Sequence, residues 1–345
     1  MAIQSVTAVI NGQTVTLEYN SSTGKYEKQL TAPLGSSNSV AEGFYGVSVT
    51  ATDTASNTVT ITPSDATYGN KLKLYVKEQV APTVSISSPS AGAYITSATP
   101  TLTFTARDNS SQASGYSGFD PSDNNVISIT LDGNTYNKST MGNILKTADM
   151  TWTNSAPNYT GSNLYGQIYV SVPFLHLSDG SHTVSITFKD KDGNISTAVS
   201  RTFTVDTVAP ALDDIAINGF TDSTVVTNIN PLTITGTTDD TSATISITLD
   251  GVDQGSVTIA QDGSFSKQIT LSADGTYAII ISAVDAAGNA TPPVSIQVTL
   301  DTYTPVFTNV ILTKVSDGSE IGSANPAEAG ATYKISVTLN DVRPS

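Results

Sequence analysis

The sequence predicts an all-β protein built of tandem antiparallel β-sandwiches, with split half-domains at the two termini. Two observations predict this fold class. Strand patterns with one apolar face and one Ser/Thr face occur throughout the chain, as in 101–105, 182–188 and 334–339, and no stretch reads as a convincing helix. Sets of strand and turn patterns also recur along the chain. Sheets that alternate in this way pack on a core with one face and meet water with the other.

Length and composition set the limits on this fold. The chain has 345 residues, enough for about two or three domains of ordinary size. It contains no cysteine, which excludes disulfides, thiolate chemistry and zinc-thiolate sites, so stability must come from buried apolar surface.

Charge and hydropathy exclude several partners. The formal net charge is -15 although only 13% of the residues are charged, which argues against nucleic acid and anionic membranes as partners. No segment approaches the roughly 20 apolar residues of a membrane span, so we expect no membrane insertion. No signal peptide is visible, because no basic start followed by a long apolar run opens the sequence.

Three marks define the repeat. The first is a strand that ends in Asn-Gly or Asp-Gly, where both residues can adopt the positive φ of a tight hairpin. The second is a proline-containing linker after a strand, and the third is a turn of Asp and Asn after a late strand. The copies of the strand are 6–12, 127–133 and 245–251, those of the linker are 80–82, 208–210 and 303–305, and those of the turn are 53–57, 190–194 and 285–289.

The Val-Ala-Pro linkers, the Ile-Ser-Ile-Thr-Leu-Asp-Gly strands and the Asp-Ala-Ala-Gly-Asn turn at 285–289 carry a resemblance to a known family. The chain resembles the bacterial immunoglobulin-like (Big-type) domains that occur along surface adhesins and along tail proteins of bacteriophages and prophages. The resemblance covers most of the chain and implies immunoglobulin-like sandwiches. It implies a spacer or binding module rather than one particular function, because one fold hosts many functions. Without a visible signal peptide or wall anchor, it favours the phage structural proteins.

The marks divide the chain into four segments. Residues 80–207 form a complete immunoglobulin-like domain with insertions, and residues 208–303 form a second complete one. Residues 1–79 lack the two opening strands of the repeat, whereas residues 304–345 contain only strands that read as those two. The two ends are therefore expected to be complementary halves of one domain, joined within the same chain or with a neighbouring one.

An incomplete sandwich leaves unpaired backbone and an exposed apolar face, both of which are costly in water. Val310 and Leu312 share one strand face, and Ile335, Val337 and Leu339 share another, so these residues could supply the missing core. We favour strand complementation between chains, which would produce an open filament. The alternatives are closure within one chain, and two ends that are either small independent sheets or the result of a trimmed chain.

The sequence predicts no catalytic residues and no enzyme. The two histidines, His176 and His182, have no nucleophile motif near them, and no phosphate-binding loop is present. The acidic residues fall mostly in turns, where Asp is favoured for local backbone hydrogen bonds.

Calcium at the domain joints is the one cofactor that the sequence suggests. The incoming linker, the turn after the second strand and the late-strand turn of an immunoglobulin-like sandwich lie at the same end, so their acids would converge and supply oxygen ligands. The alternative is that these acids cap turns at an edge of the domain that is exposed to water. The candidates are Glu78, Asp108, Asp190, Asp192 and Asn194 for the second domain, and Asp206, Asp239, Asp240, Asp285 and Asn289 for the third.

The insertions of the second domain, 109–125 and 134–174, are the best candidates for recognition. Aromatic faces beside amides suit sugar rings or protein partners. The alternative is that these aromatics cover an enlarged sheet. The candidate ligand-binding residues are Tyr116, Phe119, Trp152, Tyr159 and Tyr165.

We therefore expect a non-enzymatic structural or adhesive protein on a virion or an extracellular surface. The favoured interpretation is a segment of a phage tail or other virion appendage (fibre) that assembles by strand complementation with itself or a neighbouring structural protein. The alternative is a cell-surface or glycan-binding adhesin module that recognises a host-surface glycan or protein through the aromatic insertions.

Overall fold

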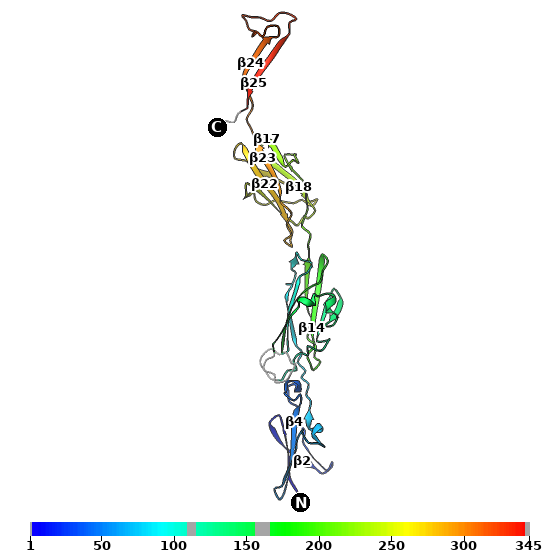
Figure 1. Ribbon diagram of the computed structural model, residues 1–345. Coiled ribbons are helices and arrows are strands. Elements are labelled where there is room, and N and C mark those ends of the chain that lie inside the picture. The colour runs from blue at the N-terminus through cyan, green and yellow to red at the C-terminus, as the bar shows by residue number, and fades with distance from the viewer. Residues whose placement is uncertain (1, 109–114, 156–165, 342–345) are drawn as a thin grey trace. The chain divides into compact units, whose positions relative to one another are not determined.

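The structure is a computed structural model that describes residues 2–108, 115–155 and 166–341 (Figure 1). Within these ranges the chain contains β-strands and four short 3-10 helices but no α-helix. No helix there is long and apolar enough to cross a membrane. The chain divides into two compact units, 1–207 and 208–345. The predicted fold class is confirmed: the protein is all-β, with tandem antiparallel sandwiches.

Residues 1–79 form one antiparallel sheet in the order β3-β2-β1-β4-β5, with β6 paired to β4. Its buried apolar residues among those described are Val6 and Ala8. The large core clusters lie elsewhere, in 86–205 and 217–300. The elements are β1 (Ile3–Ile10), β2 (Gln13–Asn20), β3 (Lys25–Glu27), η1 (Ser37–Ser39), β4 (Tyr45–Asp53), β5 (Thr58–Ile61), η2 (Gly69–Leu72) and β6 (Lys73–Leu74).

The second domain is a sandwich of two sheets, β11-β10-β14-β15-β8 and β12-β13-β9-β7. Alternate residues of β9, β10 and β14 point into a core in which Phe104, Phe119 and Phe188 are fully buried. The elements are β7 (Thr83–Ser88), β8 (Tyr94–Ile95), β9 (Thr101–Arg107), β10 (Ile127–Leu131), β11 (Asn134–Asn137), η3 (Met141–Asn143), η4 (Thr147–Asp149), β12 (Thr151–Ser155), β13 (Gln167–Pro173), β14 (Gly180–Phe188) and β15 (Val199–Val205).

The third domain repeats this plan with the sheets β16-β18-β21 and β17-β23-β22-β19-β20, several strands of which are labelled in Figure 1. Its core includes Leu232 and Ile234 from one sheet and Ile247, Ile281 and Val298 from the other. The strands are β16 (Leu212–Ile217), β17 (Thr224–Thr227), β18 (Leu232–Thr238), β19 (Thr244–Leu249), β20 (Val252–Asp253), β21 (Ser264–Ile269), β22 (Gly275–Val284) and β23 (Val294–Leu300).

The last two strands, β24 (Val306–Lys314) and β25 (Tyr333–Asn340), pair antiparallel with each other and form a two-stranded sheet. Val337 and Leu339, expected to enter a core, are each 51% exposed. Val310, Leu312 and Ile335 are exposed as well. These five residues therefore form an apolar surface that the chain, as described, does not cover.

The predicted hairpin turns are confirmed in all three copies. Asn11 has a φ of 47° and Gly12 one of 74°, and the Asp-Gly pairs at 132–133 and 250–251 have closely similar angles. Two consecutive residues with positive φ match the right-handed twist of the strands that they join. The sequence signal thus sets the register of β1 with β2, of β10 with β11 and of β19 with β20.

His182 on β14 ties a loop to the second sandwich. Its Nδ1 lies 2.7 Å from Oδ2 of Asp132, and its Nε2 lies 2.7 Å from the carbonyl oxygen of Ser178. Burial works to lower the pKa of His182, but the hydrogen bonds to Ser178 and Asp132 outweigh it and raise the pKa above the ordinary value. Both ring nitrogens face acceptors, so the protonated ring satisfies the site best.

The raised pKa predicts a pH-dependent contribution of His182 to stability. The stabilisation is complete below the unfolded-state pKa of about 6.5 and is lost as the pH rises through the higher folded-state pKa. The difference in free energy of unfolding between wild type and His182→Gln should therefore be constant below about pH 6 and shrink as the pH rises above about 6.5. Denaturant unfolding at several pH values measures it, and a constant difference would contradict the assignment.

Candidate metal centre

Three loops at one end of the second sandwich bring acidic side chains together. Glu78 lies in the linker before β7, Asp108 directly follows β9, and Asp190 lies in the turn after β14. One oxygen from each of the three carboxylates lies within 4.8 Å of the others, and all three residues are buried. The convergence expected for Glu78, Asp108 and Asp190 is thus present in the structure.

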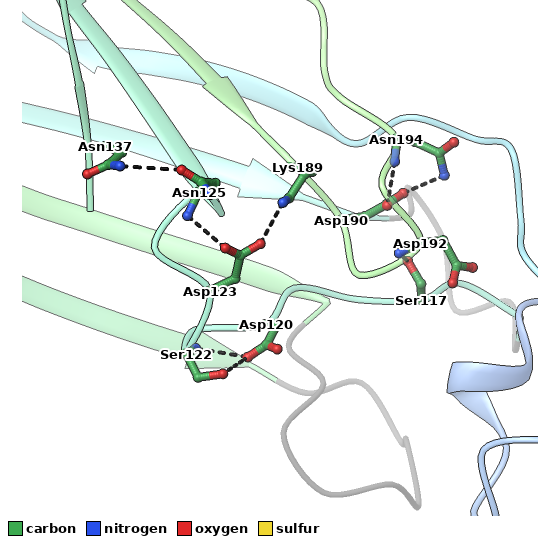
Figure 2. A network of polar contacts seen from close by, with 10 residues as sticks. All are labelled: Ser117, Asp120, Ser122, Asp123, Asn125, Asn137, Lys189, Asp190, Asp192 and Asn194. Atoms are coloured by element: carbon green, nitrogen blue, oxygen red, sulfur yellow. Dashed lines mark hydrogen bonds and ion pairs between the residues drawn. The ribbon is translucent and has the colours of Figure 1, made fainter. Parts of the chain in front are cut away.

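The turn after β14 is held together by hydrogen bonds between its first and last residues, Asp190 and Asn194. Oδ1 of Asp190 accepts the N–H of Asn194 at 2.7 Å, and Oδ2 accepts the side-chain amide of Asn194 at 2.7 Å (Figure 2). That same amide donates to the carbonyl oxygen of Glu78 at 3.2 Å. Asn194 therefore holds the late-strand turn against the incoming linker.

Asp108 is the most buried member, at 1% exposure. Its Oδ2 accepts the N–H of Gly118, whereas its Oδ1 is buried without a hydrogen-bond partner. A buried carboxylate oxygen without a partner is costly, and native structures usually supply a donor, a water or an ion at such a place. Oδ1 of Asp108 is therefore an acceptor to which no described protein atom donates a hydrogen bond.

The electrostatics of the cluster agree with this interpretation. Burial, together with the neighbouring carboxylate of Glu78, raises the pKa of Asp108 to about 7. Burial likewise raises the pKa of Glu78 to about 6 and that of Asp190 above its ordinary value. Lys189, next to Asp190, pairs with Asp123 at 2.6 Å instead (Figure 2). A cation in the cluster would reverse these shifts by favouring the ionised carboxylates.

Asp192 connects the cluster to residues 1–79. Its Oδ1 accepts the side-chain amide of Asn38 at 2.7 Å, and its Oδ2 accepts the N–H of Glu78 at 2.9 Å. Its own N–H donates to Oγ of Ser117 at 3.3 Å. Sequence reasoning missed Asn38 and Ser117, because neither stands in a repeat mark and only the fold brings them to Asp192.

The donor set suits a hard cation. Glu78, Asp108 and Asp190 offer oxygen only, and carboxylates with backbone carbonyls are the ligands that calcium takes. In the described ranges this is the one group of at least three acidic, imidazole or thiol side chains with ligand atoms so close.

The residues predicted for the third domain each make hydrogen bonds, some of them local and some with more distant parts of the chain. Oδ1 of Asp239 accepts the N–H of Ala211, and Oδ1 of Asp240 accepts the N–H and hydroxyl of Ser242. Asp285 and Asn289 form the same clamp as Asp190 and Asn194. Asp206 follows β15 and donates its N–H to the carbonyl oxygen of Ile95. Calcium binding by this set stays a prediction.

The aromatic residues proposed for recognition separate into different places. Phe119 is fully buried, with its ring 5.4 Å from that of Phe188, so its assignment to a ligand-binding surface is corrected to a core role. Tyr116 is half-buried, and Trp152 stands on β12 opposite Val170. Tyr159 and Tyr165 lie outside the described residues.

Comparisons with known proteins support the fold of the domains. A family model described as "Glucodextranase, domain B" matches residues 214–302, which is the third sandwich. Together with the sheet topology, this match supports an immunoglobulin-like fold. The match covers this one domain, and the chain as described is built of tandem β-sandwiches. No curated protein sequence matches it.

Solved structures of tandem β-sandwich proteins are also similar. The fibronectin(III)-like modules of Clostridium thermocellum CbhA are 15% identical, with 64% of this chain and 94% of that chain covered and a TM-score of 0.34. A 1.5-MDa bacterial ice-binding adhesin is 20% identical, with 87% and 88% covered and a TM-score of 0.29. The ICAM-5 D1–D4 ectodomain fragment is 10% identical, with 86% and 82% covered and a TM-score of 0.41. Similarity at this level concerns the fold alone.

The contacts of Asp192 predict a local loss of order when it is replaced. Asp192→Ala removes two acceptors, and hydrogen bonds to a charged group contribute about 1.5 to 3 kcal/mol each. The amide of Glu78 should then exchange its hydrogen several-fold faster, as measured by hydrogen-exchange mass spectrometry or NMR. Asp262→Ala, which removes only the local bonds to Ser264, serves as the control. Unchanged exchange at Glu78 would contradict the linking role of Asp192.

Proposed function

We propose that this chain is a non-enzymatic structural protein, a segment of a phage tail or other virion appendage, in which calcium fixes a joint between immunoglobulin-like domains. The resemblance of the linkers and turns to phage tail and adhesin domains supports the structural role. The linker, the loops of the second sandwich and residues 1–79 meet at this joint, and the candidate calcium site lies among them.

The single observation behind the calcium assignment is the unpartnered Oδ1 of Asp108 inside a group of three buried carboxylates. Burial is the main cause that raises the pKa of each of these acids, and repulsion from neighbouring carboxylates, Asp192 included, raises the pKa further. Calcium bound by Glu78, Asp108 and Asp190 would offset most of their negative charge and join the linker to two loops of the sandwich. The ion would supply a rigid connection and no further chemistry.

The contacts around the cluster support a joint. Besides the bonds of Asp192, the N–H of Ser36 donates to the carbonyl oxygen of Gly115, and the N–H of Ser37 donates to that of Val76. The linker residue Glu78 accepts the N–H of Ser117. Each bond crosses from residues 1–79 to a loop or strand of the second domain or holds the linker in place.

A catalytic role has little support among the described residues. Both ring nitrogens of His182 are bound to Asp132 and Ser178, so the ring holds a loop, and His176 is exposed on the surface. The three residues of the carboxylate cluster are buried, which suits the binding of an ion.

Calcium addition to the intact, metal-stripped chain tests the proposal. Binding to the folded state alone at a calcium concentration of about 100 times Kd should stabilise it by about 2.7 kcal/mol. Calorimetric titration should detect binding to the wild type, and the melting temperature of the first unit should rise with calcium. Asp108→Asn should lose both responses because it removes a ligand charge.

Asp285→Asn is the matched control, since Asp285 occupies the same turn position in the third domain as Asp190 does in the second. This variant should respond to calcium as the wild type does. An equal calcium response of Asp108→Asn and wild type would place the ion away from Asp108 and contradict the proposal. No binding at millimolar calcium would also contradict it and would indicate that the buried carboxylates are neutralised by protons instead.

A further inference from the structure

The third sandwich carries a cavity with apolar and aromatic walls. Its volume is about 370 Å³, which lies in the range of small-ligand pockets. Four large apolar side chains in its lining, which also includes Asn228 and Asp301, are between 48% and 67% exposed. Apolar side chains gathered in this way on a protein surface mark an interaction site. The four are Phe220, Val226, Ile229 and Tyr303.

Phe220 is held in place by a tight turn after β16. Asn218 and Gly219 form the turn, with φ angles of 52° and 85°. The N–H of Phe220 donates to the carbonyl oxygen of Ile217 at 2.9 Å, and the N–H of Ile217 donates to that of Phe220 at 2.9 Å. Two backbone hydrogen bonds therefore fix the point from which the ring of Phe220 projects.

The acid of the cavity is tied to the end of β17. That strand runs parallel to β23, with Val226 opposite Thr299 (Figure 1). Where the pair ends, the N–H of Asp301 donates to the carbonyl oxygen of Thr227 at 2.9 Å. The N–H of Ile229 donates to Oγ1 of the same threonine at 3.1 Å. These bonds bring the carboxylate of Asp301 next to the apolar residues of the cavity.

Tyr303 is positioned by the linker that follows β23. The N–H and the hydroxyl of Thr302 donate to the carboxylate of Asp274, at 2.8 Å and 3.0 Å. The N–H of Tyr303 donates to Oδ1 of Asp301 at 3.2 Å. The walls of the cavity are thus attached to the sandwich through its backbone, so little order has to be gained when a ligand binds.

The second domain repeats the clamp but not the aromatic residue. The N–H and the hydroxyl of Thr207 donate to Asp179 as those of Thr302 donate to Asp274. The residue after Thr207 is Val208, however, where the third domain has Tyr303. The tyrosine is therefore not needed to build the linker, and its ring is available for another purpose.

Asp301 offers a free acceptor beside the aromatic residues. Its Oδ1 accepts the N–H of Tyr303, whereas no described residue donates a hydrogen bond to its Oδ2. The carboxylate is half-buried. A half-buried carboxylate is less screened by water than an exposed one and attracts a cation more strongly.

The charge of the whole domain selects the ligand class. Residues 208–303 contain eleven aspartates and one basic residue, Lys267. This balance repels anions and attracts cations. The faces of Phe and Tyr rings also attract cations, and the methylene stem of a long basic side chain packs well on apolar residues. Arginine combines these features, because its planar guanidinium pairs with a carboxylate through two hydrogen bonds and stacks on aromatic rings.

We propose that this cavity binds an arginine side chain from a basic segment of a partner protein. The guanidinium donates to Oδ2 of Asp301 and lies against the ring of Tyr303 or Phe220, while the methylene stem packs on Val226 and Ile229. The contact goes beyond the proposed structural role, because it gives the third domain a binding partner. It uses none of the residues of the candidate metal centre, so it does not depend on calcium.

NMR titration of the intact, methyl-labelled chain tests the proposal. The probe is the peptide acetyl-Gly-Arg-Gly-amide, added in the presence of a calcium chelator. The methyl signals of Val226 and Ile229 should shift, with a dissociation constant on the order of 1 mM for this single side chain. The control peptide contains citrulline, which has nearly the same shape as arginine but no charge. It should bind at least about tenfold more weakly.

Two variants test the site. Asp301→Asn keeps the acceptor for the N–H of Tyr303 but removes the charge, and it should raise the dissociation constant of the arginine peptide at least about tenfold. Tyr303→Val introduces the residue of the second domain and should raise it several-fold. The matched control is Asp262→Asn, because Oδ1 of Asp262 bonds only to the nearby Ser264. This variant should change the constant by less than about twofold.

Four results would overturn the proposal. Equal binding of the arginine and citrulline peptides would show that charge is not recognised. Equal effects of Asp301→Asn and Asp262→Asn would show a general attraction to the acidic domain instead of a site. Methyl signals that do not move at about 10 mM peptide would show that no arginine binds. Signals that move with maltotriose but not with the arginine peptide would show that the cavity takes a sugar.

Discussion

Every sheet in this protein has one apolar face, and the need to cover that face governs the architecture. The second and third domains meet it with two facing sheets, so that Phe104, Phe188, Ile234 and Ile281 are fully buried. Residues 1–79 form one sheet and β24–β25 another, and within the described residues Val310, Ile335 and Val337 of the latter are exposed. Since apolar burial is the dominant favourable term in folding, contact with further apolar surface would stabilise this face.

The ends of the sandwiches are governed by charge rather than by apolar burial. The Asp–Asn clamp that closes the late-strand turn occurs three times, at Asp53, Asp190 and Asp285. Among the described residues, only in the second domain do two further acids meet it, one from the linker and one directly after β9, and the carboxylates become buried. Buried charges persist only with a counter-charge or a proton. The turn at Asp190 therefore belongs to a candidate ion site because Glu78 and Asp108 lie beside it.

The sequence predicted what depends on local pattern. Alternating Ser/Thr and apolar residues predicted the strands, and Asn11-Gly12 and its copies predicted the positive-φ turns. The convergence of Glu78, Asp108 and Asp190 was also predictable, because repeat position fixes the end of the sandwich at which each residue lies. The contacts of the candidate site with residues 1–79 were not predictable, since Asn38 lies 154 residues from Asp192 and carries no pattern.

The burial of single aromatic residues could likewise not be predicted from the sequence. Phe119 stands in a loop rich in Ser and Gly, which suggests exposure, yet the loop folds its ring onto Phe188 in the core. Loop residues have no periodicity from which the buried face can be read. For the strands of the terminal segments, by contrast, the alternation identified the apolar face of β25, although not what covers it.

Calorimetric titration with calcium at several pH values tests the central claim most directly. Burial raises the pKa of Asp108 to about 7 and that of Glu78 to about 6, so calcium must displace protons from these carboxylates at lower pH. Binding should therefore weaken and release protons as the pH falls from about 8 to about 5. Binding of equal strength over this range, with no proton release, would contradict an ion held by Glu78, Asp108 and Asp190.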